Sequence, residues 1–214
     1  TNFVIALGYK SKQVKDYLKI AHVKSTFEFV DIKNFNGPGS GLKHTLICCQ
    51  NFLQLPFIFV SCDSYFKDKL PPPNKNWIAY STSDNLNDYR SINLKNNKIV
   101  SLNEKNTIKK NSYPYTGICG INSYKVFWKS LNNQKIKINR GEIDGLQDIL
   151  KNKIIKGIKI DWYDTGNVKS LIETRKIFER NNKVNILYKE KEAIYFANNL
   201  VIKYSYDKNF IKNR

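Results

Sequence analysis

Residues 57–66 read FIFVSCDSYF: four apolar residues are followed by small polar residues and one carboxylate, Asp63. An apolar run of this length predicts a buried strand that is parallel to its neighbours and covered on both faces. In open α/β sheets, ligands bind beyond the carboxyl ends of such strands, which is where Asp63 falls. We therefore interpret Asp63 as a metal-binding carboxylate, although the stretch taken alone favours the alternative role of a helix N-cap.

The sequence before this stretch alternates strand and helix patterns. Residues 3–7 predict a buried strand, apolar residues at helical spacing follow over 14–21, and residues 26–30 predict a second strand. A connection at 34–41 with three glycines leads into a helical stripe over 42–53. This order predicts a Rossmann-like α/β fold, with a mixed, mainly parallel sheet flanked by helices and joined by right-handed crossovers.

Beyond the three prolines at 71–73 the predicted strands become shorter. Asparagine-rich turns separate them, which predicts antiparallel pairing in this part. The strands are expected at 77–80, 89–94, 99–102 and 115–121, with helices near 124–131 and 142–150. A further strand at 154–161 runs into a polar turn, where Asn167 predicts the N-cap of another helix.

The end of the sequence predicts a separate small unit. Residues 181–186 are polar and are interpreted as a linker. Two apolar runs at 193–197 and 200–204 flank two asparagines, which tolerate the positive φ of a tight hairpin. We therefore expect one domain over residues 1–180, and the beginning of another over residues 187–214 that carries a small β-hairpin.

Composition argues against several classes of protein. The 36 Lys and Arg against 18 Asp and Glu give a net charge of +18. The lysines, however, are spread through every predicted element among many asparagines, which is typical of a coding bias and not of a specific nucleic-acid patch. No apolar run approaches the length of a membrane span. The four cysteines lack metal-site spacing, and Cys62 and Cys119 fall in predicted buried strands, as expected of reduced thiols in a cytoplasmic protein.

Seven short motifs, taken in order, resemble the sugar-phosphate nucleotidyltransferases of the glucose-1-phosphate thymidylyltransferase and phosphocholine cytidylyltransferase type. The matching segments are IALGYKSKQVKDYL (5–18), GPGSGLKHTL (37–46), PFIFVSCDSYF (56–66), LNEK (102–105), YPYTGICGI (113–121), RGEIDGLQDIL (140–150) and WYDTGN (162–167). Together they cover most of residues 1–180. The resemblance implies that a nucleoside triphosphate is coupled to a sugar phosphate or similar phosphorylated small molecule, with release of pyrophosphate.

The resemblance also implies that Asp63 and Asp164 are two carboxylates that hold Mg²⁺. Both follow predicted strands, about a hundred residues apart in the sequence. Mg²⁺ prefers oxygen ligands and usually takes one or two carboxylates together with phosphate oxygens. The cation would offset the negative charge that gathers when the acceptor attacks the α-phosphate. For Asp164 the alternative is a turn or cap residue, but its WYDTG context favours the metal.

Substrate contacts follow from the same resemblance. The glycine-rich loop would contact the nucleotide base, because glycine lets the backbone approach a ligand closely. Asn36 and Gly39 stand where relatives usually carry Gln and Pro, so the base preference stays open, and Gly41 completes the nucleotide-binding set. Asn106 replaces the proline that follows the Glu-Lys pair in the family. The implied acceptor contacts are Glu104, Lys105, Gly117, Arg140 and Glu142.

One part of the family pattern has no counterpart in the sequence. The family's first strand carries a glycine-rich phosphate loop with an Arg and a Lys, and nothing here matches it. The chain starts at Thr1 and contains no methionine, so we expect a fragment of an enzyme that by itself is inactive or nearly so.

The tail EAIYFANNLVIKYSYDKNFIKNR (192–214) resembles the opening of a kinase-like phosphotransferase domain, which would place Lys203 over ATP phosphates. An edge hairpin protected by lysine is an equal alternative. Such a fusion resembles proteins of surface-polysaccharide biosynthesis.

A non-catalytic nucleotidyltransferase-like binding or regulatory module is the alternative function, although the retention of both aspartates favours ancestry as an enzyme. A glycosyltransferase would need an Asp-x-Asp motif, which residues 63–65 do not supply. The sequence leaves open which nucleotide and acceptor are used, and whether the protein forms a homo-oligomer.

Overall fold

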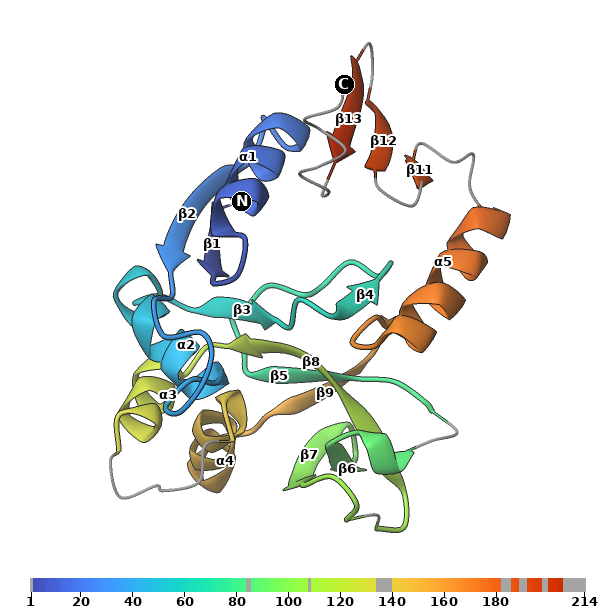
Figure 1. Cartoon of the computed structure of the whole chain (residues 1–214). Helices are drawn as coiled ribbons and strands as arrows, with labels where there is room; N and C mark the ends of the chain where they lie inside the picture. Colours follow the sequence, from blue (N-terminus) through green and yellow to red (C-terminus); the bar gives the residue numbers. More distant parts are fainter. Residues whose placement is uncertain are drawn as a thin grey trace.

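The chain begins with a parallel strand–helix–strand unit. The computed structural model describes residues 2–83, 86–107, 109–133, 140–181, 186–188, 192–197 and 200–205. Strand β1 (Asn2–Leu7) pairs in parallel with β2 (Thr26–Asp31), and helix α1 (Ser11–Ala21) forms the crossover between them (Figure 1). The strand–helix–strand order read from the sequence is therefore confirmed.

A six-stranded sheet forms the centre of the molecule. Its strands are β3 (Phe57–Val60), β5 (Trp77–Tyr80), β6 (Ser91–Lys95), β7 (Lys98–Asn103), β8 (Ser112–Ile121) and β9 (Lys156–Lys159), in the spatial order β3-β8-β5-β9-β7-β6. The pairings make β3, β5, β9 and β6 run in one direction, while β7 and β8 run against them. The fold is the expected mixed α/β fold, with most strands of this sheet pointing the same way.

Two local predictions around residue 57 were wrong. Strand β3 was expected to be parallel to its partner, but it pairs with β8 in antiparallel fashion. Cys62 was expected in a buried strand, but it is exposed in the turn that follows β3, whereas Cys119 is buried in β8 as expected. A local apolar pattern indicates a strand but does not fix its burial, since only Leu7 of β1 and only Phe57 of β3 are buried. The direction of pairing depends on a strand some sixty residues away, which that pattern does not contain.

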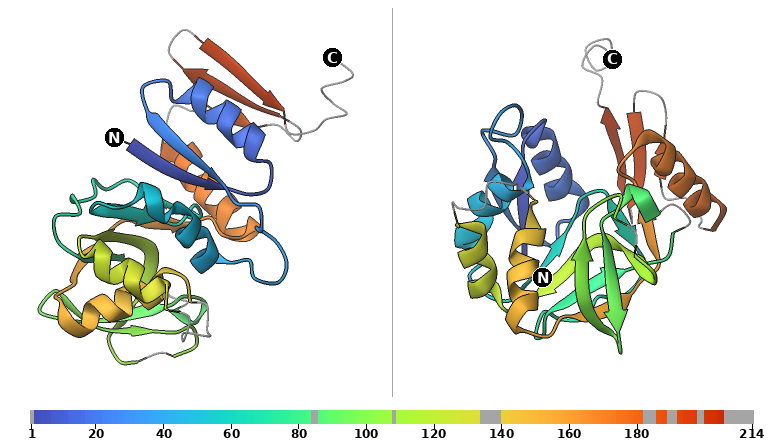
Figure 2. Two further views of the ribbon diagram at one scale, coloured as in Figure 1. Left: turned by 90° about the vertical axis from the view of Figure 1, so that its left-hand side faces the viewer. Right: turned by 90° about the horizontal axis from the view of Figure 1, so that it is seen from below.

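Helices cover one face of the central sheet. Helices α2 (Leu42–Cys49), α3 (Tyr124–Leu131) and α4 (Glu142–Asn152) lie on this face (Figure 2). Together with Ile78 and Cys119 of the sheet they contribute to the main core cluster. Because successive side chains of a strand point to opposite faces, Trp77 and Ile118 join a second cluster on the other face. Two short 3₁₀ turns, Gln50–Phe52 and Leu86–Asp88, lie in the connections.

The turn residues behave largely as the sequence predicts. Asn96 and Asn97 connect β6 to β7 with φ of 50° and 57°, the left-handed conformation that asparagine tolerates. Helix α5 (Val168–Asn181) starts after Asn167, whose Oδ1 accepts the Ser170 amide at 2.9 Å and caps the helix as expected. No helix in the part of the chain that the structure describes has the length and apolar character that a bilayer crossing requires.

The last described segments of the chain form a small sheet of their own. Strands β11 (Ile186–Tyr188), β12 (Glu192–Ala197) and β13 (Leu200–Ser205) pair antiparallel in sequence order. The sequence indicated only the β12–β13 pair. The asparagines expected to form their turn, at 198–199, lie outside the described residues. The division into domains at residues 180–187 stays a prediction.

Candidate functional site

A two-stranded ribbon brings the predicted metal carboxylates together. Strand β4 (Ser64–Phe66) pairs antiparallel with β10 (Trp162–Asp164), and Ser64 stands opposite Asp164. Next to this pair, both the amide and the hydroxyl of Thr165 donate to the Asp63 carbonyl oxygen at 2.8 Å. Asp63 and Asp164 are therefore held on one hydrogen-bonded scaffold.

Gly166 shows how closely the two carboxylates approach each other. A Cβ atom built on Gly166 would lie 3.1 Å from Asp164 Oδ1 and 3.1 Å from Asp63 Oδ2. Because both oxygens are this close to the same point, they are separated by at most twice that distance. A side chain at this position would press closely on both oxygens.

Hydrogen bonds orient both carboxylates. Ser61 Oγ donates to Asp63 Oδ1, and the Tyr89 hydroxyl donates to Asp164 Oδ2 at 3.1 Å. The Gly166 amide donates to Asp164 Oδ1 at 2.9 Å. Burial and the neighbouring Asp164 charge raise the pKa of Tyr89 to about 12, so its phenol remains a hydrogen-bond donor at neutral pH.

The carboxylate oxygens of Asp63 and Asp164 are suited to a hard cation whose remaining ligands are waters or substrate oxygens. Among the described residues no group of three or more His, Cys, Asp or Glu side chains could hold a metal alone. Asp63 and Asp164 offer carboxylate oxygens only, and Mg²⁺ typically combines one or two carboxylates with waters and substrate phosphates. Zinc and other softer metals prefer nitrogen or sulfur ligands, which the pair does not provide.

The two carboxylates lie in the wall of an open pocket of about 530 Å³. This volume is within the range of small-molecule sites. The pocket also contains three of the residues predicted to contact the acceptor: Lys105, Gly117 and Glu142. Its remaining lining residues are Ser61, Ser64, Asn87, Asp88, Tyr89, Arg90, Asn106, Tyr115, Thr116, Trp162, Gly166 and Asn167.

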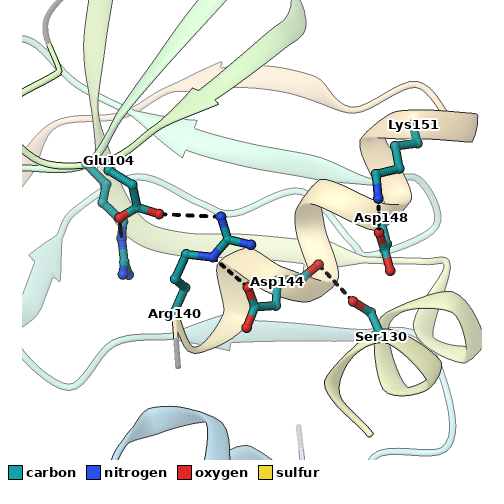
Figure 3. A network of polar contacts seen from close by, with 7 residues as sticks. Glu104, Ser130, Arg140, Asp144, Asp148 and Lys151 are labelled. Atoms are coloured by element: carbon teal, nitrogen blue, oxygen red, sulfur yellow. Dashed lines mark hydrogen bonds and ion pairs between the residues drawn. The ribbon is translucent and has the colours of Figure 1, made fainter. Parts of the chain in front are cut away.

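Glu104 and Arg140, the other two predicted acceptor contacts, belong to an ion-pair network beside the pocket. Arg90 Nε donates to Glu104 Oε2 at 3.0 Å, and Arg140 Nη1 lies 3.9 Å from Glu104 Oε1. Arg140 Nε also donates to Asp144 Oδ1 at 2.8 Å. Figure 3 shows Arg140 between the two carboxylates, with Asp144 at the first turn of α4.

Removing the Arg140 side chain is expected to destabilise the fold by about 2 kcal/mol, because the buried Asp144 carboxylate would lose its cation. The Asp144 side chain is fully inaccessible to solvent in the folded protein, so its charge depends on the guanidinium for stabilisation. Urea unfolding of Arg140→Ala measures the cost. The double variant Arg140→Ala/Asp144→Asn should recover much of it, and a double variant as unstable as the single one would contradict this explanation.

Glu142 is a buried carboxyl group at the floor of the pocket. It is 4% exposed, and burial raises its pKa above the ordinary value. Burial likewise raises the pKa of Tyr115 and Cys119, which lie beneath it, and the Tyr115 hydroxyl lies 3.7 Å from Cys119 Sγ. Glu142 Oε2 has no hydrogen-bond partner in the described part of the protein. This oxygen is almost inaccessible to solvent, so neighbouring side chains must move before a ligand hydroxyl can reach it.

The raised pKa of Glu142 predicts a particular dependence of stability on pH. The folded chain binds this proton more tightly than the unfolded chain, so the free energy of unfolding falls as pH rises from the ordinary pKa through the raised one. Glu142→Gln cannot ionise and should lack this fall, becoming more stable than the wild type above it. Urea midpoints from about pH 4 to about pH 8 test this. Parallel curves for the two proteins would contradict it.

The predicted nucleotide-binding residues lie outside the lining of this pocket. Asn36, Gly39 and Gly41 belong to the exposed connection between β2 and α2, where Asn36 Oδ1 accepts the Gly37 amide at 2.9 Å. Gly39 and Gly41 have φ of 83° and 132°, so both need the freedom of glycine. Lys203 is exposed on β13. The residues predicted to bind the metal and the acceptor therefore lie in or beside one pocket. The residues predicted to bind the nucleotide lie elsewhere.

No family model and no curated protein matches the sequence. Solved structures do match. A Bacillus anthracis protein assigned as a glucose-1-phosphate thymidylyltransferase, solved in complex with a sucrose, superposes with a TM-score of 0.68 at 22% identity, over 85% of this chain and 77% of that one. A UDP-glucose pyrophosphorylase complexed with UDP-glucose gives 0.67 at 17% identity, over 85% and 81%. The inositol-1-phosphate CTP transferase from T. maritima gives 0.60 at 15%, over 79% and 71%. The chain has the nucleotidyltransferase fold.

Within this nucleotidyltransferase fold, several pocket residues were missed from the sequence. Tyr89 and Arg90 were expected at the start of a strand over 89–94, but they precede β6, in the connection that follows a 3₁₀ turn. Ser61 was quoted only as a small residue before Asp63. Tyr115 belongs to a predicted apolar strand, whose pattern does not single out its hydroxyl. Only the position of Ser61 within two residues of a predicted ligand was a usable signal.

Proposed function

We propose that this chain is a fragment of a nucleotidyltransferase that couples a nucleoside triphosphate to a sugar phosphate or similar phosphorylated small molecule. The observation that carries the proposal is the convergence of Asp63 and Asp164 at Gly166. The same pocket contains the cation Lys105 and the buried carboxyl of Glu142. The groups proposed to stabilise the phosphates and the group proposed to bind a hydroxyl thus lie in one pocket.

In the proposed reaction an oxygen of the acceptor phosphate attacks the α-phosphorus of the triphosphate. The new P–O bond forms as the bond to pyrophosphate breaks, and pyrophosphate leaves with the electron pair. A Mg²⁺ ion held by Asp63 and Asp164 supplies positive charge for the phosphate oxygens when it is bound. Lys105 would hold the acceptor phosphate as a point charge, while Glu104, Arg140 and Glu142 would fix its hydroxyl groups.

The remaining parts of the proposal extend beyond the pocket. The loop with Asn36, Gly39 and Gly41 would approach the nucleotide base, Gly117 would pass its backbone close to the acceptor, and Lys203 would belong to a phosphotransferase-like extension. A role in surface-polysaccharide synthesis in the cytoplasm is consistent with this chemistry.

Binding of the reaction products tests the function without requiring turnover. Labelled with ¹⁵N, the protein is titrated with UDP-glucose, dTDP-glucose or CDP-choline in the presence of Mg²⁺. We expect at least one of them to shift the amide signals of Gly117, Glu142 and Gly166, and glucose to shift none. If nucleotides bind but no nucleotide conjugate does, the non-catalytic module is favoured. Absence of any shift would contradict the proposal.

Turnover is measured separately, as pyrophosphate released from each nucleoside triphosphate with glucose-1-phosphate, inositol-1-phosphate or phosphocholine. For residues 1–214 by themselves we expect no detectable release, because the sequence offers no glycine-rich loop with Arg and Lys for the triphosphate. Release that disappears in Asp164→Asn would confirm the function and contradict the expected inactivity.

A further inference from the structure

The carboxylates of Asp63 and Asp164 each accept a hydrogen bond from a hydroxyl group, an arrangement that the metal site alone does not explain. Each has one oxygen directed at Gly166, namely Asp63 Oδ2 and Asp164 Oδ1. In each, the other oxygen accepts a hydrogen bond from a hydroxyl group, that of Ser61 or Tyr89, and Asp164 Oδ1 also accepts the Gly166 amide at 2.9 Å, which helps to hold Asp164. The two hydroxyls come from different connections of the chain, one after β3 and one before β6.

We propose that Ser61 and Tyr89 are positioning residues that fix the rotation of Asp63 and Asp164 so that one oxygen of each points to a shared cation. The proposal rests on the metal site of the proposed function and assigns residues that act on it. Rotation about the last bond of an aspartate is only weakly restricted by its own geometry. A hydrogen bond to one carboxylate oxygen therefore determines where the other oxygen points.

Both hydroxyls are themselves held in place. The Ser61 amide donates to the Gly117 carbonyl at 2.9 Å, and a Cβ on Gly117 would lie 2.8 Å from the Ser61 Cβ, so the two backbones are in close contact. The ring of Tyr89 packs edge-on against Trp162 of β10, with ring centroids 5.1 Å apart. The donors are thus fixed by packing before any ligand arrives, as an orienting group must be.

These anchors also connect the metal carboxylates to the acceptor side of the pocket. Ser61 is fixed by Gly117, a predicted acceptor contact. Tyr89 precedes Arg90, whose guanidinium pairs with Glu104 and whose carbonyl accepts the Tyr115 amide at 2.9 Å. The orientation of both carboxylates therefore depends on the same segments that shape the acceptor pocket.

The test measures Mn²⁺ binding, which needs no catalysis. Mn²⁺ is a paramagnetic substitute for Mg²⁺, and its binding broadens the amide signals of Thr165 and Gly166 in ¹⁵N spectra. We expect Ser61→Ala and Tyr89→Phe each to weaken binding on the order of tenfold, the usual effect of losing a partner of a metal ligand. Ser61→Thr keeps a hydroxyl and should restore most of the affinity.

Matched controls separate positioning from general damage. Tyr163→Phe removes a hydroxyl that is bonded to Asp161 at 3.0 Å, and Ser101→Ala one that is bonded to Asn93 at 2.9 Å. Both should bind Mn²⁺ as the wild type does, and melting temperatures should be alike in all variants.

Asp63→Asn and Asp164→Asn should abolish the broadening. If they do so while Ser61→Ala and Tyr89→Phe bind normally, the positioning role is overturned and the proposed metal site stands. If the wild type itself shows no selective broadening, both are overturned.

Discussion

Gly166→Ala should weaken divalent-cation binding roughly 100-fold while leaving the fold intact. The new methyl group would lie 3.1 Å from Asp63 Oδ2 and from Asp164 Oδ1. A Mg²⁺ or Mn²⁺ ion must come within about 2.1 Å of its oxygen ligands, so the methyl group competes with it for the same space. Gly166 is exposed and has no left-handed backbone, so alanine should change the free energy of unfolding by about 0.5 kcal/mol or less.

The measurement is the Mn²⁺-induced broadening of the Thr165 amide, together with urea unfolding of the same sample. We expect a loss of affinity of roughly 100-fold, the upper end of what displaced metal surroundings produce. Asp68→Asn removes a carboxylate outside the pocket, one that accepts the Asp161 amide at 2.7 Å, and should leave Mn²⁺ binding unchanged. Normal Mn²⁺ binding by Gly166→Ala would mean that the cation does not lie between the two aspartates.

Phe127→Ala should have the largest effect on stability, about 4 kcal/mol. Phe127 is completely buried in α3 and packs edge-on against Phe57 of β3, with ring centroids 5.7 Å apart. It also lies over Gly145 of α4, where a Cβ would approach its ring to 2.2 Å. Truncation therefore opens a cavity at the junction of two helices and the sheet. Urea unfolding measures the loss, and a value below about 1 kcal/mol would contradict this packing.

A second substitution makes this packing prediction specific. Gly145→Ala should be destabilising by about 2 kcal/mol through overpacking, even though alanine favours a helix by about 1 kcal/mol. In Phe127→Ala/Gly145→Ala the new methyl group enters the vacated space. The double variant should therefore be more stable than the sum of the single effects predicts. Additive losses would show that the two residues do not share one contact.

The sequence was informative where local patterns carry the structure. The apolar run of residues 57–60 and the strand–helix–strand pattern of residues 3–30 correspond to β3 and to the β1–α1–β2 unit. Asn167 and the Asn96–Asn97 turn were predicted from conformational preferences of single residues, and both perform the expected local role. These features depend on neighbours within a few positions, which a sequence displays directly.

Contacts between distant segments could not be predicted from the sequence. The antiparallel pairing of β3 with β8, the third strand of the terminal sheet and the hydrogen bond from Tyr89 to Asp164 all depend on long-range packing. Asp63 alone was more readily explained as a helix cap. Only the resemblance suggested Asp164 as its partner, and the ribbon of β4 and β10 supplies the physical reason for their proximity.

That ribbon has a consequence for the order of folding. The hydrogen bonds from Thr165 to Asp63 close a loop of 102 residues, whereas β1 and β2 meet across a single short helix. Contacts of such long sequence separation require a large loss of chain entropy before they form, so they tend to appear late. The carboxylate pair should accordingly be among the last parts of the molecule to assemble, after the local βαβ unit has formed.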